Sequence, residues 1–105
     1  MPRGFDNVLR RVRALAVERK IRFTLKALRE LAVLGLDAKD ACEVIEDLKA
    51  PDFVKRLASD ATGEWMYVFN PHVGGISIYL KLILRDRCVV VSFHEDKDED
   101  DEENG

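Results

Sequence analysis

Two apolar stretches near the C-terminus bring a phenol, an imidazole and an ammonium group onto one face of a predicted β-hairpin. The stretches cover residues 76–84 and 88–94. Side chains alternate along a strand, and a register that buries both apolar sets together places Tyr79 opposite His94 and Lys81 opposite Ser92. The face away from the core then carries groups that transfer protons and bind anions. Such a cluster suits acid–base chemistry on a phosphodiester.

The same register makes a definite prediction about the turn and the buried face. It requires a two-residue turn at Asp86-Arg87. Alternate residues of the two strands should then meet in the core, namely Ile76, Ile78, Leu80, Leu82 and Leu84 of the first strand with Val89, Val91 and Phe93 of the second.

Helical patterns precede this hairpin. Amphipathic spacing predicts a helix over residues 5–18, a second from the cap Thr24 to Leu34, and a third that begins after Asp37 and ends by Pro51. Residues 65–69 are rich in strand formers, whereas residues 52–57 fit either a strand or a helical turn. Helices followed by strands predict an α+β domain, with N-terminal helices packed on a C-terminal antiparallel sheet. The apolar helical positions are Phe5, Val8, Leu9, Val12 and Leu15, then Leu25, Leu28, Leu31 and Ala32, then Ala41, Val44, Ile45 and Leu48.

Charge is distributed unevenly along the 105 residues. Residues 95–105 hold eight acids and one lysine, so residues 1–94 keep 16 basic and 12 acidic side chains. We expect residues 1–94 to form one domain and residues 95–105 to be a disordered acidic tail. The basic body indicates a polyanionic partner, although a solvated helix face and a solubilising tail explain the same pattern.

Other features narrow the class of protein. No stretch could span a bilayer or act as a secretion signal, so we expect a cytoplasmic protein without membrane contact. Cys42 and Cys88 lack metal-ligand spacing, so we interpret them as buried filler and expect no metal and no cofactor.

Several segments, taken in order, resemble the MqsR (motility quorum-sensing regulator) family of toxins. They include Leu34-Gly35-Leu36-Asp37, Asp52-Phe53-Val54-Lys55, Ile78-Tyr79-Leu80-Lys81 and Val90-Val91-Ser92-Phe93. The resemblance runs from about residue 8 to residue 94. It implies a fold like that of the RelE-type ribonucleases, cleavage of mRNA without a metal, and silencing by an antitoxin protein, MqsA-like or equivalent.

The resemblance also implies roles for particular residues. The family's lysine and tyrosine fall on Lys55 and Tyr79, whereas the best-known member has a lysine at the position of His94 and a glutamine at that of Met66. We predict His94 as general acid and Tyr79 as the base or as a hydrogen-bond donor to the phosphate. Lys55 should bind the phosphate. We expect further RNA contacts from the neighbouring side chains Lys81, Arg56 and Met66.

Each of these residues also has a structural interpretation. Tyr79 could lie flat on the sheet, His94 could pair with a neighbouring acid, and Lys55 and Lys81 could be solvated surface lysines. The function therefore has alternatives. One is a non-catalytic nucleic-acid-binding or regulatory module of the same fold, and a weaker one is a helix-turn-helix DNA binder, whose third helix is too acidic for a groove. The basic helices could contact mRNA, a ribosome-bound message or the antitoxin.

Overall fold

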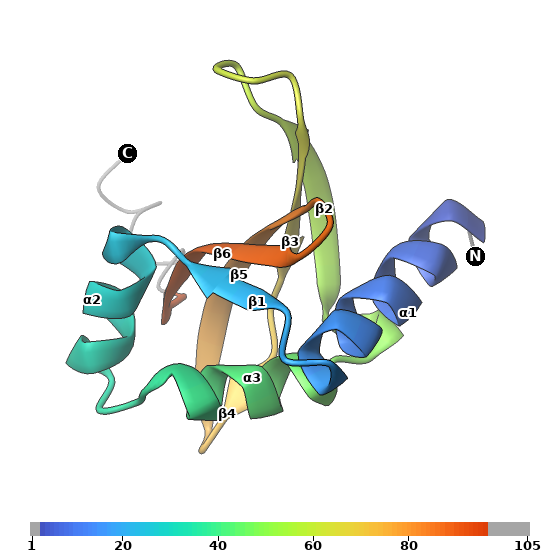
Figure 1. Cartoon of the computed structure of the whole chain (residues 1–105). Coiled ribbons are helices and arrows are strands. Elements are labelled where there is room, and N and C mark those ends of the chain that lie inside the picture. Colours follow the sequence, from blue (N-terminus) through green and yellow to red (C-terminus); the bar gives the residue numbers. More distant parts are fainter. Residues whose placement is uncertain (1–2, 97–105) are drawn as a thin grey trace, which may run out of the picture.

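The chain folds as three helices and one sheet. Most of the strands follow the helices, but one short strand lies between the first helix and the second (Figure 1). The computed structural model describes residues 3–96, with side chains from residue 7 onward, so the side chain of Phe5 and residues 97–105 of the predicted tail lie outside the described residues. The elements are α1 (Arg3–Val17), β1 (Ile21–Phe23), α2 (Leu25–Val33), α3 (Ala38–Glu46), the 3₁₀ turn η1 (Ala50–Asp52), β2 (Phe53–Ala58), β3 (Trp65–Phe69), β4 (His72–Val73), β5 (Ile76–Leu84) and β6 (Cys88–Glu95).

The predicted α+β class is confirmed, and the sheet has one feature that the sequence did not predict. The strand order is β1-β6-β5-β3-β2, and β4 pairs with β5 beside this path. All pairings are antiparallel except that of β1 with β6, which is parallel. The sheet is therefore mixed rather than purely antiparallel. A strand of three residues is too short to produce an alternation that could be recognised in the sequence.

The core lies between the helices and one face of the sheet. α1 contributes Val12, α3 contributes Ile45, and the sheet contributes Phe69, Leu80 and Phe93, all of them fully buried. In α2 the buried residues are Ala27 and Leu31, whereas Leu25 and Leu28 of the predicted apolar stripe are 62% and 42% exposed. α2 therefore packs through a narrow stripe, and part of its apolar surface stays in solvent.

Local signals fix the helix ends as predicted. The Thr24 hydroxyl accepts a hydrogen bond from the Ala27 N–H at the start of α2. Asp37 and Asp40 form a reciprocal capping box on α3. Gly35 has a φ of 74°, the left-handed conformation that ends a helix and that glycine adopts without strain.

The β5–β6 hairpin has the predicted register at its open end, but its loop and the pairing next to the loop differ from the prediction. Tyr79 pairs with His94 and Lys81 with Ser92, as expected, yet the loop holds three residues, 85–87, and not two. Val91 is an extra residue, because Lys81 pairs with Ser92 and Leu82 with Val90. This β-bulge absorbs the additional loop residue and restores the register beyond it.

The bulge also corrects the predicted core. Between the loop and the bulge, Cys88 and Val90 face the interior and are fully buried, whereas Val89 and Val91 are only partly buried. The expectation that Val89 and Val91 would join Phe93 in the core was therefore wrong. A single uninterrupted alternation was assumed, and one inserted residue reverses the faces on one side of the insertion.

Two uncertain segments are resolved by the structure. Residues 50–58 form first the turn η1 and then the strand β2. At the other end, Glu95 belongs to β6, and the Asp96 N–H donates to the Ser77 carbonyl at 2.8 Å. The strand β6 thus extends one residue into the segment predicted to be a tail, and Asp96 is hydrogen-bonded to β5.

Candidate active site on the open sheet face

Two rows of side chains cross the face of the sheet that the helices leave uncovered. Residues paired across strands point to the same face, so the pairings of β2, β3, β5 and β6 align Lys55, Val68, Lys81 and Ser92 in one row. Tyr79 and His94 form the adjacent row, two residues further along β5 and β6. The sheet register therefore brings the predicted phenol, imidazole and lysines onto one surface.

Tyr79 and His94 are in direct contact on this surface. Their ring centroids are 5.0 Å apart and the ring planes are inclined by 36°. The ammonium nitrogen of Lys81 lies 6.0 Å from the centroid of the Tyr79 ring. Both rings are partly buried, so each retains access to solvent and to a ligand. A phenol, an imidazole and an ammonium group thus lie close together on this surface.

One nitrogen of the His94 ring is already occupied. Its Nδ1 lies 2.9 Å from the backbone carbonyl oxygen of Glu95. A carbonyl oxygen can only accept a hydrogen bond, so Nδ1 carries a hydrogen in either charge state of the ring. The second nitrogen, Nε2, is therefore the atom that can give or take a proton.

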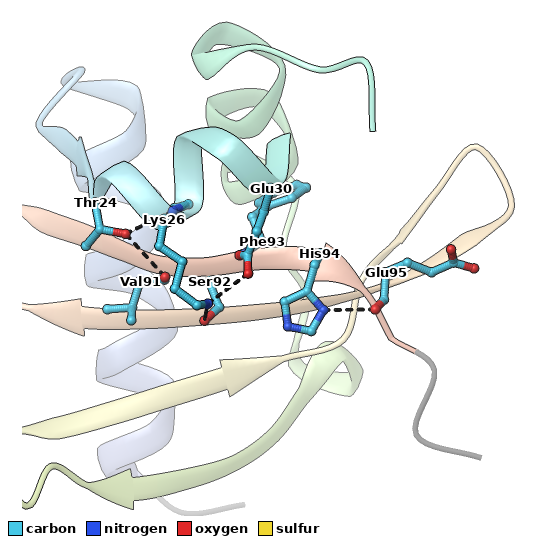
Figure 2. A network of polar contacts seen from close by, with 9 residues as sticks. Thr24, Lys26, Glu30, Val91, Ser92, Phe93, His94 and Glu95 are labelled. Atoms are coloured by element: carbon cyan, nitrogen blue, oxygen red, sulfur yellow. Dashed lines mark hydrogen bonds and ion pairs between the residues drawn. The ribbon is translucent and has the colours of Figure 1, made fainter. Parts of the chain in front are cut away.

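A polar network from α2 holds the strand on which His94 lies (Figure 2). The Glu30 carboxylate accepts the Phe93 N–H at 2.8 Å and the Lys26 ammonium group at 2.8 Å. Lys26 also donates to the hydroxyl of Ser92 at 2.9 Å. Nearer the start of α2, the Thr24 hydroxyl donates to the Val91 carbonyl at 3.3 Å. α2 thus occupies the edge of β6 beyond the end of β1 and fixes the backbone on both sides of Ser92.

Glu30 is ionised by this environment. Burial raises the pKa of its carboxyl group, but the hydrogen bonds from Lys26 and the Phe93 N–H, with the charges of Lys26 and His94, bring it below the ordinary value of 4.5. The sequence did not identify Lys26 or Glu30 as parts of the site. Their i,i+4 spacing was visible, but nothing in the sequence indicated that α2 lies along β6.

Lys55 lies at a small cavity next to Tyr79. The cavity has a volume of about 160 Å³ and is lined by both residues, by Asn70 and Asp96, and by the apolar groups of Val54, Val68 and Phe69. The side-chain amide of Asn70 donates to the Ile78 carbonyl at 2.8 Å and to the Asp96 carboxylate at 2.9 Å. Asn70 and Asp96 were not predicted, because sequence patterns place neither of them near Tyr79.

Two other predicted residues are not brought to this cluster. Arg56 pairs with Tyr67, on the helix-covered face of the sheet, and its guanidinium carbon lies 4.1 Å from the centroid of the Trp65 ring. Met66 shares the open face but is paired with Leu57 and Ile83, in an apolar row further from Tyr79. Arg10, Arg11 and Arg13 of α1 lie on the helix-covered side as well, and Arg11 donates to the Arg85 carbonyl there.

Two kinds of feature are absent from residues 3–96, the part of the chain that the structure describes. No group of three histidine, cysteine, aspartate or glutamate side chains in this part of the chain could hold a metal ion. None of its helices has the length and apolar character needed to cross a membrane.

Fold and site together define a small α+β protein whose open sheet face presents proton-transfer groups and lysines, an arrangement that suits an anionic substrate. The sequence model of the family described as "Motility quorum-sensing regulator, toxin of MqsA" matches residues 6–95. The chain therefore belongs to this toxin family, and the resemblance predicted from the sequence is confirmed. The chain is also 35% identical over 89 residues to "mRNA interferase toxin MqsR" of Escherichia coli (strain K12), a match that covers 83% of this chain and 90% of the relative.

Proposed function

We propose that this protein is the toxin of a toxin–antitoxin pair and an endoribonuclease that cleaves mRNA with side-chain acid–base catalysis. Membership of the toxin family and the name of the Escherichia coli relative support a toxin that cleaves RNA. The contact between the Tyr79 and His94 rings, 5.0 Å apart on the open face, is the observation that carries the mechanism. We also propose mRNA and a cognate antitoxin protein as partners, and ribosome-bound message as one form of the substrate.

In the proposed reaction the RNA supplies its own nucleophile. The 2′-oxygen attacks the adjacent phosphorus, a phosphorane forms, and the bond to the 5′-oxygen breaks to leave a 2′,3′-cyclic phosphate. His94 protonates the departing 5′-oxygen from Nε2, the nitrogen that the Glu95 carbonyl leaves available. As a phenolate, Tyr79 takes the proton of the 2′-OH. In its alternative role the neutral phenol donates a hydrogen bond to a phosphate oxygen, and the 2′-OH proton passes to solvent water. The lysines stabilise the negative charge of the phosphorane.

The two lysines lie at different positions relative to Tyr79 and His94. Lys81 is two residues from Tyr79 on the same strand, and its ammonium group lies 6.0 Å from the centroid of the phenol ring. Lys55 reaches the neighbouring cavity that Tyr79 also lines. We propose that Lys81 contacts the scissile phosphate and Lys55 an adjacent one. Arg56 and Met66 would meet only RNA that extends beyond this cluster.

Cleavage of a single-stranded RNA in excess EDTA tests this function. We expect discrete fragments with cyclic phosphate ends, and resistance of RNA that carries a 2′-deoxy substitution at the mapped site. His94→Ala and Tyr79→Phe should each lower the rate by about 10²–10⁴. Matched controls are His72→Ala, an exposed histidine of β4, and Tyr67→Phe, a tyrosine packed against the core on the opposite face. Both controls should cleave RNA at the wild-type rate.

Two results would overturn the proposal. Wild-type rates for both His94→Ala and Tyr79→Phe would exclude the proposed acid and base. Retention of RNA by the wild-type protein without any fragments would instead support the non-catalytic binding module.

A further inference from the structure

A second, larger pocket adjoins the candidate active site on the side of α2. It has a volume of about 310 Å³ and is lined by Glu30, Val33 and Leu34 from the end of α2 and by His94 and Glu95 from the end of β6. This volume is at the lower end of the range for small-molecule sites. The His94 side chain lines this pocket and also contacts the Tyr79 ring. The pocket therefore lies next to the position proposed for the reacting phosphate, with the His94 ring between them.

The chemistry of this pocket differs from that of the cavity beside Lys55. Its lining is mainly apolar, from Val33 and Leu34, and its ionisable groups are the carboxylates of Glu30 and Glu95 and the ring of His94. Carboxylates repel a phosphate group, but their oxygens accept hydrogen bonds from the N–H groups of a nucleobase. Each Glu30 oxygen accepts one hydrogen bond within the protein, and a carboxylate oxygen can accept a second.

We propose that the pocket binds the base of a nucleotide next to the scissile phosphate, with the base stacked on the His94 ring and against Val33. This inference rests on the proposed function. Proteins that recognise single-stranded RNA commonly take unstacked bases onto ring and apolar surfaces of this kind. The RNA would cross the Tyr79–His94 pair with a base on the α2 side and backbone phosphate on the Lys55 side.

The exposed position of Val33 allows a direct test. Its side chain is 86% exposed, so Val33→Asp should leave the fold intact. The thermal midpoint should fall only slightly, because an acid is disfavoured at the C-terminal end of a helix. The matched control is Leu25→Asp, because Leu25 is 62% exposed on the same helix and does not line the pocket. Both variants add one negative charge to α2, so Leu25→Asp reports the general repulsion of RNA by an acid on this helix.

The experiment compares oligonucleotides that contain the mapped cleavage site. One is intact, one has an abasic nucleotide on the 5′ side of the scissile phosphate, and one has it on the 3′ side. For the wild type, one of the abasic substrates should lose about tenfold in kcat/KM. Val33→Asp should lose about tenfold on the intact substrate, mainly through KM, and should lose nothing further on that abasic substrate. Leu25→Asp should behave like the wild type.

The results separate this inference from the function on which it rests. If both abasic substrates are cleaved as fast as intact RNA, or if Val33→Asp and Leu25→Asp behave alike, the pocket does not bind a base. If either occurs while His94→Ala still abolishes cleavage, only the pocket assignment fails. Full activity of His94→Ala would remove the proposed catalysis and the base site together.

Discussion

Glu30 offers the most direct test of how α2 supports the strand that carries His94. Its side chain is 21% exposed, and it accepts the backbone N–H of Phe93 at 2.8 Å. A hydrogen bond that involves a charged group contributes about 1.5–3 kcal/mol to stability, and an i,i+4 ion pair adds about 0.3–0.5 kcal/mol. We therefore expect Glu30→Ala to lower the free energy of unfolding by about 2–3 kcal/mol. Glu30→Gln keeps an acceptor for the N–H and should cost about 1 kcal/mol or less.

Urea unfolding as a function of pH measures both effects. The pKa of Glu30 is lower in the folded protein than its ordinary value of 4.5, so ionised Glu30 adds stability above that pH. This contribution is lost as the pH falls through the lower folded-state pKa. Glutamine does not titrate, so the stability difference between wild type and Glu30→Gln should shrink below about pH 4.5. Equal stability of Glu30→Ala and wild type at neutral pH would show that the α2 contact does not hold β6.

Two further predictions concern β6 and the cysteines. Val90→Ala, at a fully buried position, should lower the free energy of unfolding by about 2 kcal/mol, whereas Val89→Ala, at a partly buried one, should cost less than half as much. Chemical denaturation measures the stability of both variants. A larger loss of stability for Val89→Ala than for Val90→Ala would contradict the bulge. Burial raises the pKa of the Cys88 thiol to about 12, so Cys88 should resist alkylation at pH 8 until the protein unfolds. Burial also raises the pKa of the Cys42 thiol. Because Cys42 is a second thiol that could be labelled, the experiment uses a Cys42→Ser variant, in which only Cys88 can react. Rapid labelling of this variant in its native state would refute the prediction.

The hairpin shows how far periodicity carries a prediction. The two apolar stretches were recognised correctly, and so was the pairing of Tyr79 with His94. The loop length and the bulge at Val91 were not, because a two-residue turn without a bulge and a three-residue loop with one give the same register at the open end. The two arrangements differ in whether Val90 or Val91 is buried. Both residues are valines, so the sequence does not show which of them faces the core. Burial and turn chemistry have to be weighed together at such positions.

The site could be predicted only where its members lie on one hairpin. Tyr79, Lys81 and His94 followed from alternation within two adjacent strands. Lys55 came from the family resemblance, and the order of β2 and β3 in the sheet places it beside the Tyr79 cavity. The contribution of α2 depends on tertiary packing across more than 60 residues of sequence, as in the Glu30–Phe93 contact. A local pattern contains no information about such a contact.

The arrangement of α2 also has a consequence for solubility. An unpaired strand at the border of a sheet can recruit a strand of another molecule and start aggregation. β1 protects only the first part of β6, and beyond it Thr24 and Glu30 satisfy backbone groups that a foreign strand would otherwise claim. At the opposite border, β2 has an irregular pairing at Val54 and carries the charges of Lys55 and Arg56, two features that oppose such recruitment. The borders of the sheet are thus protected in different ways, and loss of the helical contacts should make this protein prone to self-association.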